Sequence, residues 1–167
     1  MNIDPAQEIV ALLSSEDELG CVLRGHIHVE SYIEEFIRRH LKEPDYFKNM
    51  RLEYHQKIDL ALALGLDELF KSPLRFLGNL RNDFAHKLDT KLGKQEVKNF
   101  YSSFSAEAKE LIHSTIQKTN KSLSKQTGKV VKNEWTDFDV KTQFSLLVIS
   151  LEAGLFVELK RVRKSVV

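Results

Sequence analysis

The chain has 167 residues, of which 42% are hydrophobic, so it is long enough to bury a sizeable core as one folding unit. Its single cysteine, Cys21, excludes an internal disulfide and predicts a reducing, cytoplasmic environment. The net charge of +1 excludes a uniformly basic chain, but residues 1–90 hold 11 basic and 16 acidic side chains while residues 91–167 hold 14 and 8. Any nucleic-acid contact is therefore expected mainly on the second half.

Apolar residues in the first half recur with a helical period, and few glycines or prolines interrupt it. Asp4 and Ser72 are expected to cap the first and last helices of this half, and Pro73 suits the first helical position after Ser72. The predicted elements are four helices and one short turn, over Pro5–Leu13, Glu16–Lys42, Met50–Leu64, Asp67–Phe70 (the turn) and Pro73–Leu88.

In the second half, helices are predicted over Lys94–Ser103, Ala106–Asn120 and Phe138–Lys160, the last capped by Asp137. Residues 118–136 carry little structural signal and predict a mobile basic loop or an arm that faces RNA. The final segment, 137–164, is apolar on nearly every side between Phe144 and Val157, which indicates a helix central to the core or to a subunit interface.

Together these elements predict an all-α fold, a single-domain helical bundle of about six to seven helices over residues 1–167. The N-terminus has no pattern of a secretion signal. The longest apolar tract, 144–157, contains Glu152 and is too short for a membrane span, so no membrane association is expected.

The segment Arg81–His86 lies within the predicted Pro73–Leu88 helix and places an imidazole, a guanidinium and an amide within two turns. Asn82 and His86 share a helical face, and Arg81, about 140° from His86, is long enough to reach the same anion. This set favours metal-free proton transfer beside a bound phosphate. The alternative is a solvated helix face with an ion pair between Asp83 and Lys87.

The Arg-x4-His spacing of Arg81 and His86, with apolar residues just upstream and Phe84 inside, resembles the motif of the HEPN superfamily. The resemblance implies an all-helical domain and, as in many members, a metal-independent endoribonuclease of a toxin, anti-phage or RNA-processing system. It also implies a homodimer, since the motifs of two subunits usually face each other there.

A second resemblance covers residues 15–90 and is to the mannitol operon repressor family. Its marks are the segments Ser14–Gly20, Lys57–Leu66 and Leu80–His86, in this order. This resemblance implies a non-catalytic transcriptional regulator that acts through protein contacts, with the motif kept for structure. Residues 91–167 match neither family.

Two hypotheses follow. In the first, His86 acts as general base on a ribose 2′-OH or as acid on the leaving oxygen, Arg81 stabilises the phosphate charge and Asn82 orients one of them, leaving 2′,3′-cyclic phosphate ends. In the second, the chain is the regulator described above. The expected partners are a second copy of the chain, whose interface includes the motif helix, RNA in the first case, and an antitoxin or a transcription factor. No cofactor and no metal are expected.

The candidate RNA-binding residues are lysines next to the motif and at short intervals in the basic segment, namely Lys87, Lys121, Lys125, Lys129 and Lys132. His26 lies on the apolar stripe of the long helix and is interpreted as a hydrogen-bonded core residue. It is only two residues from His28, which is poor ligand geometry. Arg24 and Glu30 could extend an active surface, but their spacing does not require it.

Overall fold

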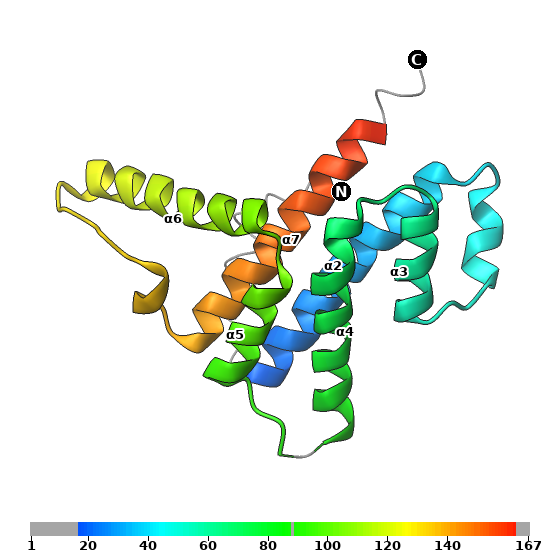
Figure 1. The fold of residues 1–167 in the computed structure, drawn as a ribbon, viewed down its shortest axis with the longest axis horizontal. Helices are drawn as coiled ribbons and strands as arrows, with labels where there is room; N and C mark the ends of the chain where they lie inside the picture. Colours follow the sequence, from blue (N-terminus) through cyan, green and yellow to red (C-terminus); the bar gives the residue numbers. More distant parts are fainter. Residues whose placement is uncertain (1–16, 88, 163–167) are drawn as a thin grey trace.

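The computed structural model describes residues 17–87 and 89–162. Within these residues the chain forms six α-helices and three short 3₁₀-helices and contains no strand (Figure 1), which confirms the predicted all-α bundle. The elements in chain order are α2 (Glu18–His40), η1 (Pro44–Asn49), α3 (Tyr54–Ala63), η2 (Glu68–Phe70), α4 (Lys71–His86), α5 (Lys94–Ser103), α6 (Ala106–Thr127), η3 (Trp135–Asp137) and α7 (Val140–Val162). The predicted helix over Pro5–Leu13 lies outside the described residues.

Helices α2 and α7 form the centre of the bundle and lie side by side along much of their length (Figure 1). A Cβ added at Gly25 of α2 would lie 3.2 Å from the methyl groups of Val148 on α7, so the small residue permits the close approach of the two helices. Their facing side chains are fully buried at helical spacing and include Val22, Val29, Ile33, Phe144, Leu147 and Leu151.

The remaining helices cover this central pair. α3 and α4 pack on α2 and on each other, whereas α5 packs between α4 and α7. A row of aromatic rings joins these layers: Phe76 of α4 stacks on Phe100 of α5 with ring centroids 5.2 Å apart, and Phe100 lies 5.6 Å from Phe144 of α7. α4 is therefore held from two sides.

The basic segment 118–136 differs from the prediction of a loop, because α6 continues through it to Thr127. Lysine, serine and glutamine are compatible with a helix, but polar residues on all sides give no apolar period from which to predict one. α6 ends where Gly128 adopts a left-handed conformation with φ 67°. The chain then returns along the helix, where the Val131 amide donates to Ser124 Oγ at 2.8 Å.

α6 projects from the bundle (Figure 1) and contacts the rest of the described chain mainly through α7. Ile112 and Ile116 are buried. Leu111 lies about 100° around the helix from Ile112, and its side chain is 67% exposed.

Two predicted helix caps are also wrong. α4 begins at Lys71, two residues before the predicted start at Pro73 and directly after the 3₁₀ turn of η2. Ser72 therefore lies inside the helix, and no side chain caps its start. At α7, Asp139 Oδ1 accepts from the Thr142 amide at 2.8 Å, whereas Asp137 Oδ2 accepts from the Glu134 amide at 2.7 Å within η3.

Among the described residues, one helix is long and apolar enough to cross a membrane, over Val140–Arg161 of α7. The tract that was judged too short in the sequence is extended by less apolar residues on either side. α7 packs along α2 in the centre of the bundle, with Phe144, Leu147 and Leu155 buried. A central core helix of this kind accounts for the apolar composition.

Candidate functional site

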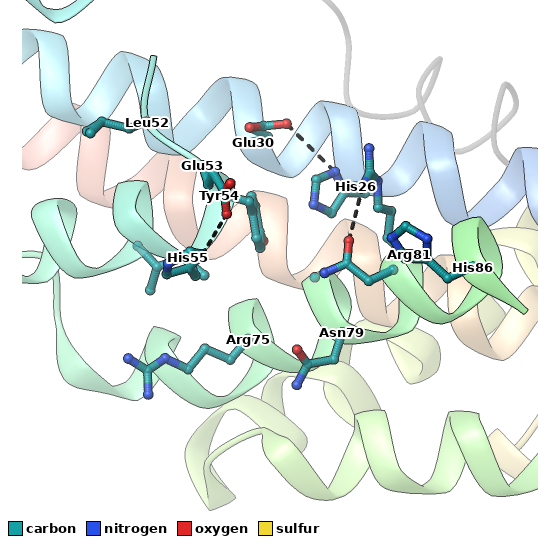
Figure 2. A pocket seen from close by; sticks show the side chains of 13 residues that line it. His26, Glu30, Leu52, Glu53, Tyr54, His55, Arg75, Asn79, Arg81 and His86 are labelled. Atoms are coloured by element: carbon teal, nitrogen blue, oxygen red, sulfur yellow. Dashed lines mark hydrogen bonds and ion pairs between the residues drawn. The ribbon is translucent and has the colours of Figure 1, made fainter. Parts of the chain in front are cut away.

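A cavity of about 620 Å³ opens between α2, the start of α3 and α4 (Figure 2). The three predicted catalytic residues, Arg81, Asn82 and His86, all line it. The other lining residues are His26 and Glu30 of α2, Leu52 and Glu53 just before α3, Tyr54, His55 and Ile58 of α3, and Arg75, Gly78 and Asn79 of α4.

α4 contributes a polar face to this cavity. Arg75, Asn79, Asn82 and His86 follow one another at intervals of three or four residues, which places them along one side of the helix. Arg81 is half-buried, and its Nη1 donates to Asn82 Oδ1 at 3.0 Å, while Asn82 and His86 are exposed. Arg81, Asn82 and His86, which their spacing in the sequence had grouped together, therefore share one cavity.

The wall opposite this face contains His26, whose side chain is 6% exposed. Its Nδ1 lies 3.7 Å from Glu30 Oε2, one helical turn along α2, and its ring centroid lies 4.2 Å from that of Tyr54. Burial lowers the pKa of His26 below its ordinary value, the charge of Glu30 opposes this, and the charges of Arg81 and Lys57 add to the lowering.

Glu30 is shared between His26 and a lysine of α3. Lys57 Nζ donates to Glu30 Oε1 and to Glu34 Oε1, each at 2.7 Å. Burial opposes the charge of Lys57, but its hydrogen bonds to the two carboxylates and their negative charges outweigh burial and raise the pKa of the amine. Lys57 thus connects α3 to α2 and fixes the carboxylate that faces His26.

Tyr54 lines the cavity beside His26. Its hydroxyl donates to the Leu74 carbonyl oxygen at 3.2 Å, and burial, with a smaller contribution from Glu30, raises its pKa well above the ordinary value. A Cβ at Gly78 would lie 2.6 Å from Tyr54 Cδ1, so only glycine at this position lets the ring lie against α4. Tyr54 is therefore a neutral, fixed wall of the cavity.

The predicted RNA-binding lysines are not brought to the cavity. Lys87 directly follows α4, and its Nζ forms the expected ion pair with Asp83 Oδ1 at 2.7 Å. Lys121, Lys125, Lys129 and Lys132 are exposed on the outer part of α6 and the segment after it, away from α4 (Figure 1). Their basic surface and the cavity are separate parts of one chain.

Sequence reasoning placed His26 in the core and assigned no role to Tyr54 or Lys57. His26 and Glu30 are four residues apart on one helix, which was a usable signal for a paired imidazole and carboxylate. The burial of His26 was predicted correctly. The missing information was that α3 and α4 leave a cavity beside this buried position.

In residues 17–87 and 89–162, no group of three or more His, Cys, Asp or Glu side chains is arranged to hold a metal ion. Comparisons of the chain with protein-family models, curated proteins and solved structures give no match. Both family resemblances of the sequence therefore remain predictions, and the function is inferred from the chemistry of the cavity.

Proposed function

We propose that the chain is a metal-independent endoribonuclease of the HEPN type and that the cavity between α2, α3 and α4 is its active site. The observation that carries this proposal is the presence of Arg81, Asn82 and His86 on one cavity that also contains the buried imidazole of His26. A guanidinium for phosphate charge and an imidazole for proton transfer are the groups that RNA cleavage by an internal nucleophile requires.

In the proposed reaction, the 2′-oxygen of one ribose attacks the neighbouring phosphorus and the bond to the 5′-oxygen breaks. His86 transfers a proton, either from the 2′-OH or to the departing 5′-oxygen. Arg81 hydrogen-bonds the non-bridging phosphate oxygens, and Asn82 holds the guanidinium through the 3.0 Å hydrogen bond. The products carry a 2′,3′-cyclic phosphate and a 5′-OH.

The polar face of α4 favours an extended single strand as substrate. From Arg75 to His86 the helix rises about 16 Å, which is long enough to follow more than one phosphate of a strand. His55 is exposed at the rim, where an unpaired base can stack on it. Access to a splayed strand is easier than access to a nucleotide within an RNA duplex.

The test is cleavage of a single-stranded RNA by purified protein in EDTA, with analysis of the product ends. His86→Ala and Arg81→Ala should each lower the rate by about 10²-fold or more. Arg81→Lys should restore little, because a point charge does not replace a planar guanidinium. His113→Ala is the matched control outside the cavity and should cleave like the wild type. Absence of cleavage by the wild type, or full activity of His86→Ala, would refute the nuclease proposal.

A second candidate function is a non-catalytic regulator similar to the mannitol operon repressor, acting through protein contacts. The hydrogen bond of Arg81 to Asn82 and the ion pair of Asp83 with Lys87 favour it, because they give motif side chains a structural role. In that case Arg81→Ala should lower the stability of the end of α4 while the wild type cleaves no RNA.

A further inference from the structure

His26 is an unusual residue for the wall of a polar cavity. A histidine with a side chain only 6% exposed must lose most of its hydration, which is costly unless its environment replaces the lost interactions. The environment here is built from three helices, and it leaves one edge of the ring on the cavity.

One nitrogen of the imidazole and the ring itself have identified neighbours. Nδ1 faces Glu30 Oε2 at 3.7 Å, and the Tyr54 ring contacts the imidazole at an interplanar angle of 46°. Glu30 is itself held by the 2.7 Å hydrogen bond from Lys57. A carboxylate beside Nδ1 favours the tautomer that carries its proton on Nδ1, so that Nε2 is free to accept a proton.

The ring also lies next to the motif. Figure 2 shows the Arg81 side chain between those of His26 and His86, and all three line the same cavity. A phosphate bound by Arg81 would therefore lie in the cavity that both imidazoles line. This is the arrangement that transfer of one proton to the substrate and removal of another require.

We propose that His26 is the second proton-transfer group of this site, the general base, with His86 as the general acid and with Glu30 and Lys57 as positioning residues. The proposal rests on the proposed nuclease function. It gives one chain both proton-transfer groups, where the family resemblance would take the second from a partner subunit.

Two protons are transferred in the reaction. His26 Nε2 accepts the proton of the ribose 2′-OH as the 2′-oxygen forms its bond to phosphorus, and the bond from phosphorus to the 5′-oxygen breaks. His86 donates its proton to that oxygen. His26 is then protonated and His86 neutral, and exchange with water restores both. The lowered pKa of His26 supports its assignment, because the imidazole is neutral at pH 7 and ready to accept a proton.

A substrate with sulfur in place of the bridging 5′-oxygen separates the two roles, since a thiolate leaves without protonation. On ordinary RNA, both His26→Gln and His86→Ala should lose about 10²-fold or more in kcat. On the 5′-thio substrate, His86→Ala should recover most of the wild-type rate and His26→Gln should not. Recovery of His26→Gln in place of His86→Ala, or a wild-type rate for His26→Gln on both substrates, would overturn the proposal.

The pH profile gives a second test that does not depend on replacing His26. Charged groups on all three helices act on the pKa of His26, namely Glu30 of α2, Lys57 of α3 and Arg81 of α4. The other titratable side chains that line the cavity are Glu53, Tyr54, His55, Arg75 and His86. Glu30→Gln removes the negative charge that raises the pKa of His26, so the acidic limb of kcat/KM should move to lower pH. Glu34→Gln is the matched control, since Glu34 binds Lys57 equally but does not face His26.

The experiments distinguish failure of the nuclease function from failure of the role assigned to His26. If the wild type cleaves no RNA, the nuclease function fails and the role of His26 falls with it. If the wild type cleaves and His86→Ala does not, but Glu30→Gln leaves the acidic limb in place and His26→Gln is fully active, only the assignment of His26 is wrong.

Discussion

Burial of the His26 imidazole links the stability of the bundle to pH. Because burial, the largest cause, lowers its pKa below the ordinary value of 6.5, the unfolded chain binds more protons than the folded chain as the pH falls through 6.5. The contribution is fully favourable above that pH and is lost on acidification. The free energy of unfolding, measured with urea between pH 5 and 8, should therefore decrease below about pH 6.5.

His26→Gln should remove this part of the pH dependence, because glutamine has no proton to gain. His113→Gln is the matched control: His113 lies exposed on α6, where its Nε2 hydrogen-bonds the Tyr101 hydroxyl. An unchanged slope in His26→Gln would show that other groups cause the acid sensitivity.

Single residues also show the limits of reading a site from sequence. Arg81, Asn82 and His86 were found because they lie close in sequence, and helical spacing predicts where each one points. His26 and Tyr54 come from separate helices. Their 4.2 Å ring contact depends on how α2 and α3 pack, which no local pattern encodes.

Asp139 and Ser72 both lie near the start of a helix, but only one of them caps it. Asp139 accepts from the Thr142 amide at the start of α7, so Asp139→Ala should lower the free energy of unfolding by about 1 kcal/mol. Ser72 lies inside α4 and caps nothing, so Ser72→Ala should change it by less than about 0.5 kcal/mol. Urea denaturation of both variants checks this pair, and an equal cost for both would contradict the assigned caps.

Most helices could be predicted because their apolar residues face a core and so recur with the helical period. The long α2 and the short α5 follow this rule, and α5 has the predicted bounds of Lys94–Ser103. The outer part of α6 has few buried neighbours, and its residues from Lys118 to Thr127 have no apolar period to reveal the helix. Apolar periodicity arises only where one face of a helix is buried. A helix that projects into solvent therefore cannot be predicted from it.

We expect the chain to form a homodimer. An apolar groove of about 500 Å³ lies between the start of α6 and α7, and Pro73 of the motif helix also lines it. Several large apolar side chains that line this groove are exposed, namely Leu69, Leu111 and Val157. A stable dimer through this surface should bury more than about 1,000 Å² in total.

Sedimentation at micromolar concentration should show the dimer, and Leu111→Glu should dissociate it without unfolding the bundle, because Leu111 is exposed. Val130→Glu is the matched control, since Val130 is exposed and does not line the groove. A monomeric wild type would overturn the prediction.

The contact between Gly78 and the Tyr54 ring has a thermodynamic consequence for any ligand of the cavity. The cavity is walled by three helices and by a ring that lies directly on the backbone of α4, with a hydroxyl bonded to Leu74. The walls of this cavity cannot move apart without separating α3 from α4. An oligonucleotide that binds there binds only the folded chain, so its affinity should appear as an increase in Tm that grows with the logarithm of its concentration.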